Sequence, residues 1–274
     1  MSSDEAESVA KIARWLQRSN RTELIAGALR NAIDYVLDGT HTGRYDIRDL
    51  DKIEKTFIGL KAEHFVMHDL GLNATRIRGQ LDTVIEDEPI DIKFSLATDW
   101  MIPREAVGHL CLLLSANDLE SKHSIGVFLA EDAYLGSENR DGKRSILSHA
   151  RENHVHWVAR HAPLPENILL HLSDENRTAI FSHRYGQQRV LELFRRVKNQ
   201  PIPKKVLSTV AQQDEPRARA RDAARVLKND GIFVYTHLKN DKAESYGLPR
   251  MSKGWWMAGT VDVNLLLADP DAVE

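Results

Sequence analysis

Hydrophobic residues in the first 38 positions recur every three or four residues. Ile12 and Leu16 belong to one such run, Leu29 and Ile33 belong to a second, and Gly39 follows them. Apolar residues at this spacing line one face of an amphipathic helix, and glycine often stands just after its end. The pattern therefore predicts one or two helices over residues 5–38, packed against a core or in a dimer.

Strict alternation of apolar and polar residues replaces this spacing further along. It occurs in the runs Leu81–Ile85 and Ile90–Phe94, which the short acidic segment Glu86–Pro89 separates. Two alternating runs across a short turn predict a β-hairpin. A turn at the centre of the acidic segment pairs residues whose numbers sum to 173, so Asp82 lies across from Asp91.

One face of this hairpin carries charged groups. The Cβ atoms of Asp82 and Asp91 are expected roughly 4.5–5.5 Å apart. Lys93 projects to the same face, while Ile92 and Phe94 point to the other face, into a core. Two carboxylates at this separation repel each other unless a cation lies between them. Two carboxylates beside a backbone carbonyl suit Mg²⁺, which prefers oxygen ligands.

These residues resemble the catalytic core of PD-(D/E)xK nucleases, with Asp91 and Lys93 as the D-x-K. Upstream, KTFIGLKAE at 55–63 resembles the K-[TG]-x-x-G-x-x-x-E helix entry of MutH-type and NaeI-type DNA endonucleases, in which Glu63 takes the acidic position. Residues 44–130 resemble a type II restriction endonuclease of the NaeI family. Leu81 replaces the proline that usually precedes the first aspartate. The competing interpretation is a solvated cross-strand ion pair.

The segments after the hairpin fill in the predicted nuclease domain. Glu105–Ala116 is apolar and predicts a core helix under the sheet, whereas Ser124–Ala130 predicts a buried strand. The resemblance implies an α/β fold with a central mixed sheet flanked by helices. It also places the segment after the D-x-K strand near DNA, so Trp100 and Arg104 are candidate DNA contacts, with a core position as the alternative for Trp100. Arg140 and Lys143 are candidates on a polar loop that could equally be a plain surface excursion.

Composition limits the class of protein. The 274 residues allow one large domain or two smaller ones. The sequence contains no run of 18 apolar residues, so no membrane span is expected. The acidic N-terminal segment is unlike a secretory signal. The single cysteine, Cys111, excludes an intramolecular disulfide and indicates a buried thiol in a reducing, prokaryotic cytoplasm.

Charge is unevenly distributed along the chain. The formal net charge is −3, yet residues 184–261 hold sixteen Lys and Arg against seven Asp and Glu. A basic C-terminal part suggests a nucleic-acid-binding module. We therefore expect an endonuclease domain over residues 1–178 and a DNA-binding domain over residues 179–274.

The C-terminal pattern predicts a winged helix-turn-helix. Three helices are expected at 187–198, 203–212 and 217–229. A strand at 232–237, a basic loop at 238–254 and a returning strand at 255–263 follow them. Helix-turn-helix proteins place the last of the three helices in the major groove. The predicted DNA contacts are the stripe Arg217, Arg221 and Arg225, the flanking Arg219 and Lys228, and, on the wing, Lys239, Lys242, Arg250 and Lys253. The alternative is a solvated charged surface.

The whole pattern indicates a Mg²⁺-dependent endonuclease that cuts double-stranded DNA at a specific sequence. Asp82, Asp91 and the Ile92 carbonyl are expected to bind Mg²⁺, Lys93 to orient the attacking water, and Glu63 to hold a metal-bound water or a second ion. The resemblance implies products with 5′-phosphate and 3′-hydroxyl ends, a homodimer, a cognate methyltransferase and possible activation by a second DNA site.

Two alternatives stay open at this stage. A MutH-like enzyme would nick one strand or respond to base methylation. A winged-helix regulator would bind DNA without cutting it and would use its N-terminal domain for dimerisation.

Overall fold

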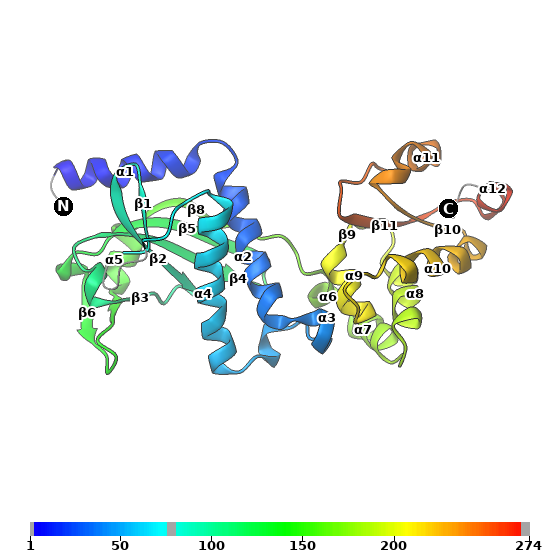
Figure 1. Cartoon of the computed structure of the whole chain (residues 1–274), viewed down its shortest axis with the longest axis horizontal. Coiled ribbons are helices and arrows are strands. Elements are labelled where there is room, and N and C mark those ends of the chain that lie inside the picture. Colours follow the sequence, from blue (N-terminus) through cyan, green and yellow to red (C-terminus); the bar gives the residue numbers. More distant parts are fainter. Residues whose placement is uncertain (1–2, 76–80, 270–274) are drawn as a thin grey trace. The chain divides into compact units, whose positions relative to one another are not determined.

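The computed structural model describes residues 3–75 and 81–269. Gly79 and Gln80, which begin the predicted hairpin stretch, lie outside the described residues. The chain packs as two compact units: Met1–Val36 with Leu50–Glu166, and Leu37–Asp49 with Asn167–Glu274 (Figure 1). The first unit thus ends at Glu166, upstream of the boundary expected after residue 178. Residues 37–49 belong to the second unit although they are enclosed in sequence by the first.

A five-stranded mixed sheet forms the centre of the first unit. Its strands run in the order β1-β2-β4-β5-β8, with β2 and β4 parallel and every other pair antiparallel. Helix α1 packs against β5 and β8, and α4 packs against β2 (Figure 1). The expected mixed sheet with flanking helices is confirmed. The strands are β1 (Thr83–Ile85), β2 (Glu88–Ser95), β4 (Leu110–Asn117), β5 (Lys122–Leu129) and β8 (His156–Pro163).

The helices of this unit are largely as predicted. They are α1 (Ser3–Gln17), α2 (Arg21–Leu37), α4 (Lys52–Asp69) and α5 (Ser148–Asn153). Helix α4 is continuous and contains the whole motif at 55–63. Asp51 and Glu54 form a capping box at its start, so each side chain accepts a hydrogen bond from the other residue's backbone N–H.

The predicted helix at Glu105–Ala116 is wrong. A single 3₁₀ turn, Arg104–Ala106, is followed by β4, which lies between β2 and β5. Every residue of β4 except Asn117 is buried. A strand that is covered on both faces reads as a continuous apolar run, so its sequence lacks the alternation that distinguishes a strand from a buried helix. The buried strand predicted at Ser124–Ala130 is confirmed as β5.

The hairpin register is the predicted one. Thr83 pairs with Ile90 and Ile85 pairs with Glu88, so paired numbers sum to 173. The two turn residues, Glu86 and Asp87, have φ values of 50° and 64°. Positive φ at both central positions is typical of type I′ turns, whose twist matches that of the flanking strands.

A small second sheet completes the first unit. It has the strand order β3-β7-β6 and is fully antiparallel. Trp100, Ile102 and Leu135 share its buried cluster with Cys111 and Phe128 of the central sheet. This cluster covers the face of the sheet to which Cys111 and Leu113 point. The strands are β3 (Met101–Ile102), β6 (Leu135–Glu138) and β7 (Arg144–Ile146).

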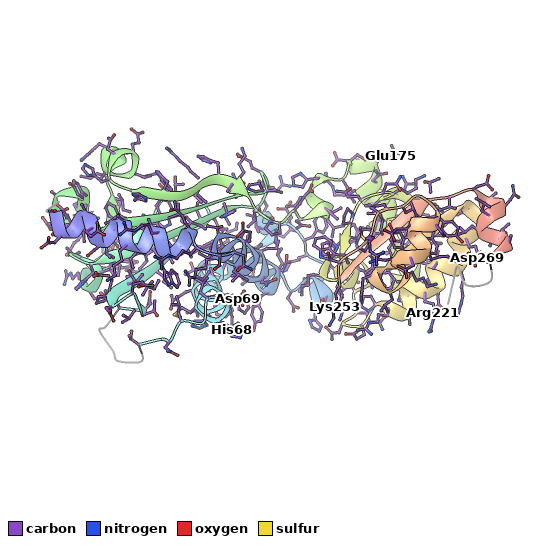
Figure 2. The ribbon with its side chains drawn as sticks, turned by 90° about the horizontal axis from the view of Figure 1, so that it is seen from above. His68, Asp69, Glu175, Arg221, Lys253 and Asp269 are labelled. Carbon is purple, nitrogen blue, oxygen red and sulfur yellow. The ribbon has the colours of Figure 1, made fainter. Side chains whose placement is uncertain are left out.

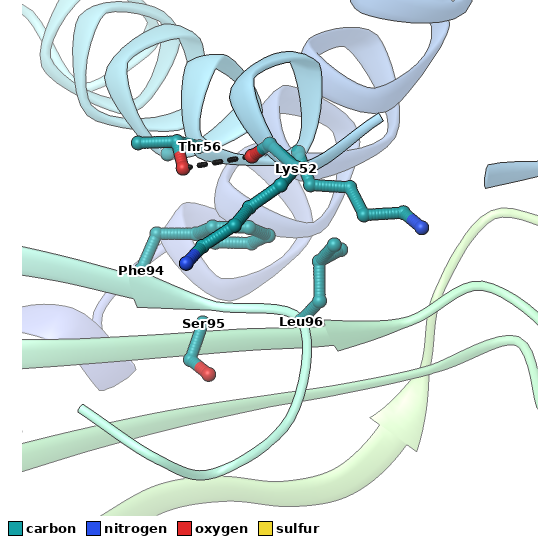
Figure 3. A pocket seen from close by; sticks show the side chains of 7 residues that line it. Lys52, Thr56, Phe94, Ser95 and Leu96 are labelled. Atoms are coloured by element: carbon teal, nitrogen blue, oxygen red, sulfur yellow. Dashed lines mark hydrogen bonds between the residues drawn. The ribbon is translucent and has the colours of Figure 1, made fainter. Parts of the chain in front are cut away.

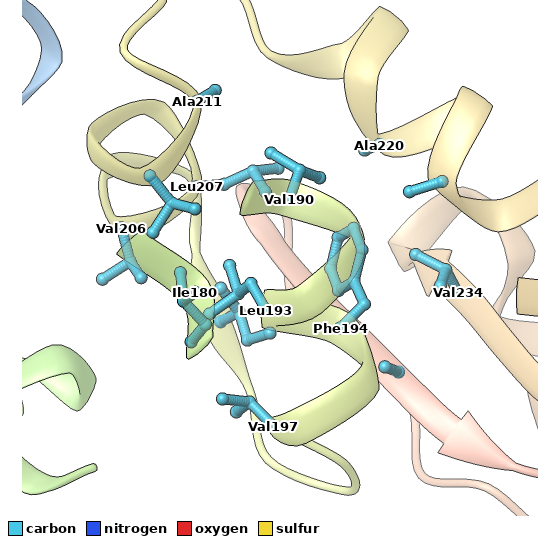
Figure 4. Packing of buried hydrophobic residues seen from close by; sticks show 14 of the residues in the cluster. Ile180, Val190, Leu193, Phe194, Val197, Val206, Leu207, Ala211, Ala220 and Val234 are labelled. Carbon is cyan, nitrogen blue, oxygen red and sulfur yellow. The ribbon is translucent and has the colours of Figure 1, made fainter. Parts of the chain in front are cut away.

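The second unit combines helices with a three-stranded antiparallel sheet of order β10-β11-β9. Phe194 of α8 packs among Leu193, Val190, Ala220 and Val234 in its main core (Figure 4). Its elements are α3 (Gly39–Thr42), α6 (Ile168–His171), α7 (Asp174–Phe181), α8 (Gly186–Arg196), β9 (Ile202–Pro203), α9 (Lys204–Ala211), α10 (Arg217–Leu227), β10 (Ile232–Thr236), α11 (Asn240–Ser245), β11 (Trp255–Thr260) and α12 (Val263–Ala268).

One local prediction for this unit is wrong. Residues 238–254 are not an open basic loop, because they contain α11, whose Ala243 is buried with Phe233 and Tyr235. On α10, Ala224 is buried and Val226 is 48% exposed. No helix in the described ranges is long and apolar enough to cross a membrane.

Candidate active site

The hairpin brings three of the predicted side chains into direct contact. Lys93 Nζ lies 2.8 Å from Asp91 Oδ2 and 3.8 Å from Asp82 Oδ2. It also donates a hydrogen bond of 3.1 Å to the Ile92 carbonyl oxygen. One ammonium group therefore contacts two carboxylates and the backbone oxygen of Ile92, the residue between Asp91 and Lys93.

The strand backbone fixes the position of Asp82. Its Oδ2 accepts a hydrogen bond of 2.7 Å from the Ile92 backbone N–H, across the hairpin. The Asp82 carbonyl oxygen accepts a second hydrogen bond from the Thr75 N–H. Asp82 lies just before β1, so these bonds hold it against β2 where the ladder of β1 has not yet begun.

Burial strengthens the electrostatic interactions among the charged groups of this cluster. The Asp91 side chain is only 4% exposed, whereas Asp82 and Lys93 are partly exposed. Burial raises the pKa of Asp91 to about 6, although Lys93 favours its ionised form. Burial lowers the pKa of Lys93, but Asp91 and Asp82 more than offset it, so the net pKa is raised and the ammonium stays charged.

Glu63 lies beside this cluster on α4. Burial raises its pKa to about 7, and the Asp82 carboxylate adds to the rise, while Lys93 opposes it. Within the described residues no group of three His, Cys, Asp or Glu side chains is already arranged around a metal position. Glu63 therefore experiences the charges of the hairpin but does not complete a closed ring of ligands with them.

The donor set nevertheless fits a hard divalent cation. Its oxygens are two carboxylates and a backbone carbonyl, which is the chemistry that Mg²⁺ selects. The buried Asp91 and the neighbouring Asp82 already converge on a cation, the Lys93 ammonium. A cation brought to these oxygens would lower the electrostatic cost that the raised pKa values of Asp91 and Glu63 express.

A basic pocket lies between α4 and the end of β2 (Figure 3). It has a volume of about 430 Å³ and is lined by Lys52, Lys55 and Thr56 of α4 and by Phe94 and Ser95 of β2. Phe94 directly follows Lys93 and is only half-buried, so it does not lie fully in the core as expected. The motif at 55–63 includes Lys55, but neither lysine was predicted to contact DNA. The spacing between Lys55 and Glu63 in this motif was the signal that could have indicated such a contact.

The predicted DNA contacts of the first unit have different surroundings. Trp100 is 1% exposed and its Nε1 donates a hydrogen bond to the Leu114 carbonyl, so its prediction as a DNA contact is wrong. Arg104 is exposed but forms a two-point ion pair with Glu138. Arg140 and Lys143 are exposed on the β6–β7 turn.

The predicted contacts of the second unit lie at its surface, and several have acidic neighbours. Arg217 and Arg225 of α10 pair with Glu215 and Asp222 at 3.5 and 3.1 Å. Arg221 and Lys253 are exposed (Figure 2). The others contact neighbours in the unit: Arg219 contacts Gln213, Lys228 and Lys242 contact Asp269, Lys239 lies over Phe233, and Arg250 pairs with Asp241 and Glu244.

Comparison with known proteins identifies the family of this chain. The family model "Restriction endonuclease NaeI" matches residues 10–263, and the chain is 36% identical over 248 residues to the type II restriction enzyme NaeI of Lentzea aerocolonigenes. That alignment covers 86% of this chain and 77% of the relative. The chain therefore belongs to the NaeI family of type II restriction endonucleases, a family of site-specific deoxyribonucleases.

Proposed function

We propose that this protein hydrolyses phosphodiester bonds in both strands of duplex DNA at a specific sequence, with Mg²⁺ as cofactor and with 5′-phosphate and 3′-hydroxyl ends as products. The observation that carries the proposal is the convergence of Asp82, Asp91 and the Ile92 carbonyl on one cation position, held by Lys93. A purely structural ion pair would need only one carboxylate for each ammonium.

The residues divide the chemical work. Asp82, Asp91 and the Ile92 carbonyl would hold Mg²⁺, which when bound polarises the scissile phosphate and favours ionisation of the attacking water. Lys93 orients that water and stabilises the negative charge that develops on the phosphate. Glu63, whose pKa is raised to about 7, accepts a proton from the attacking water or holds that water in place.

The second unit would bind DNA as a winged helix-turn-helix. Supporting this, α8, β9, α9, α10, β10 and β11 follow one another in the chain, and β11 lies between β10 and β9 in the sheet. In that arrangement α10 enters the major groove and its exposed Arg217, Arg221 and Arg225 meet bases or phosphates. The segment that contains α11 takes the place of a simple wing, and its cations, Lys239, Lys242, Arg250 and Lys253, would contact the backbone.

Membership of the NaeI family supports a proposal for the biological setting. Two copies of the chain would form a homodimer, because a pair of active sites related by symmetry cuts both strands of a palindrome. A cognate methyltransferase would protect the same sequence in the host cytoplasm, and a second copy of the site, bound by the second unit, would activate cleavage.

In the deciding experiment, plasmid DNA is incubated in Mg²⁺ with the wild-type protein and, in a separate reaction, with an Asp91→Asn variant. Discrete fragments from the wild type and none from the variant support the proposal, and sequencing of the ends gives the site and the end chemistry. Nicked circles without linear product would instead support the MutH-like alternative. Binding that survives EDTA, with no cleavage of unmethylated or methylated DNA, would support the regulator.

A further inference from the structure

A second polar pocket lies on the catalytic face of the central sheet. It has a volume of about 280 Å³, and we call it the β8 pocket after the strand that carries its main residues. Lys93, Leu113, Gly126 and Trp157 form one row across β2, β4, β5 and β8. The pocket is lined by Ser124, Arg151, Glu152, Trp157, Arg160 and His161, among others.

The Trp157 indole lies on the same face as Lys93. Residues in register across neighbouring strands project to the same side of a sheet. A Cβ atom on Gly126 would lie 3.3 Å from Trp157 Cε3 and 2.5 Å from Val155 Cγ1, so the glycine leaves the space into which this indole packs. Three strand spacings separate Lys93 from Trp157, a distance of about 14 Å. This length corresponds to about four base pairs along a DNA axis.

Two of the residues that line the pocket each carry a buried donor atom without a hydrogen-bond acceptor. These atoms are Trp157 Nε1 and Arg151 Nε. A buried donor that lacks an acceptor costs about 1–3 kcal/mol, so native proteins rarely leave two of them in one place. Arg151 Nη1 donates hydrogen bonds to Asp99 Oδ1 at 3.2 Å and to Thr98 Oγ1 at 3.3 Å, and these bonds hold the guanidinium in position.

A strand irregularity brings further positive charge to the same pocket. The register of β5 and β8 shifts next to Ile125, and His161 has a φ of 54° while its N–H donates to Ser124 Oγ. Bulges of this kind redirect side chains and are common near functional sites. The Arg160 guanidinium lies 5.1 Å from the centre of the Trp157 ring. The exposed Glu152 is the one carboxylate among the residues that line the pocket.

We propose that the β8 pocket binds a backbone phosphate of the same DNA duplex that the hairpin cleaves. A phosphate supplies acceptor oxygens only, which matches the indole N–H and the two guanidinium groups. Its place on the catalytic face, about 14 Å from Lys93, lets one duplex occupy both positions. The phosphate contact would fix the register of the duplex relative to Asp91 and Lys93. The proposal rests on the proposed cleavage of duplex DNA.

The test measures binding of a short duplex that carries the mapped cleavage site, in Ca²⁺ so that DNA stays intact. Arg160→Ala should weaken binding about 3- to 10-fold and reduce the slope of log K against log salt by about 0.9, the value for one lost phosphate contact. Trp157→Phe keeps the packing but deletes the N–H, so it should weaken binding without changing the slope. Glu152→Gln should tighten binding, an effect that misfolding would not produce.

Arg18→Ala, an exposed cation of the same unit outside the pocket, is the matched control and should leave affinity and slope unchanged. Thermal unfolding of every variant shows whether the fold is retained. Arg160→Ala with wild-type affinity and slope would overturn the phosphate site and leave the nuclease proposal standing. Wild-type protein that never cuts DNA would instead remove the proposed function itself.

Discussion

Lys93 Nζ and Asp91 Oδ2 lie 2.8 Å apart at the centre of the candidate site, and the Asp91 side chain is almost fully buried. The ammonium thus occupies the position at which the carboxylates of the hairpin converge. A divalent cation at the same oxygens would compete with it. The role proposed for Lys93 therefore requires that its ammonium turn from these oxygens toward the water and the phosphate when a metal ion binds.

Replacement of Lys93 should separate metal binding from catalysis. Lys93→Met removes the competing ammonium, so Mg²⁺ or Mn²⁺ binding measured by calorimetry should be as tight as in the wild type or tighter. Cleavage should fall by about 10² to 10³, the usual effect of losing one group that stabilises transition-state charge. Loss of metal binding together with activity would contradict this division of roles.

The raised pKa of Glu63 predicts a pH-dependent cost to stability. Its pKa in the fold is about 7, above the usual 4.5. The stabilisation that the protonated form provides is complete below pH 4.5 and is lost as the pH rises through about 7. Glu63→Gln should therefore raise the free energy of unfolding relative to wild type at pH 8, by about 1–2 kcal/mol after allowance for partial exposure, and by little at pH 5.

Urea unfolding in EDTA at the two pH values measures this difference. Glu120→Gln, an exposed glutamate in the same unit, serves as the control and should show no such pH-dependent gain. If the difference in unfolding free energy between Glu63→Gln and wild type is the same at pH 5 and pH 8, the raised pKa of Glu63 is contradicted.

The basic pocket on α4 predicts a contribution to DNA binding. Lys52 and Lys55 lie about three and two turns from Glu63 on one helix, and we expect a DNA strand bound at the candidate site to reach them. The double variant Lys52→Ala/Lys55→Ala should reduce the salt slope of binding by about 1.8 and the affinity about tenfold or more. Lys122→Ala is the comparison, and an equal effect there would mean that only net charge matters.

Arg221 tests the role of α10. Arg221→Ala should weaken DNA binding by about 1–3 kcal/mol if the guanidinium reads a base, and selectivity between specific and unrelated duplexes should fall with it. Loss of affinity that is equal for both duplexes would instead assign Arg221 to a phosphate. Unchanged binding to either would contradict insertion of α10 into the groove.

Trp100 should behave as a core residue. Trp100→Ala should destabilise the protein by about 3–5 kcal/mol through the cavity that it leaves. Trp100→Phe keeps most of the packing and loses the bond to the Leu114 carbonyl, so it should cost about 1 kcal/mol and leave DNA affinity unchanged. Weaker DNA binding by a stable Trp100→Phe variant would instead support Trp100 as a DNA contact.

Local patterns determined the parts of this protein whose causes are local. The alternation around Glu86 and Asp87 set the hairpin register, because a shift of one residue would reverse the two faces of each strand. That register alone placed Asp82 opposite Asp91 and put Lys93 beside them. The family resemblance came from these residues together with the upstream motif at 55–63 that ends at Glu63.

Tertiary structure decided what no local pattern records. Strand β4 looked like a helix because burial on both faces removes alternation. Trp100 was expected at the DNA because the family resemblance places the segment after the D-x-K strand there, whereas its neighbours in space form a buried apolar cluster. The segment before β11 looked like an open loop, but Phe233 and Tyr235 supplied the apolar surface on which α11 packs. The β8 pocket joins residues from distant segments, so only packing could reveal it.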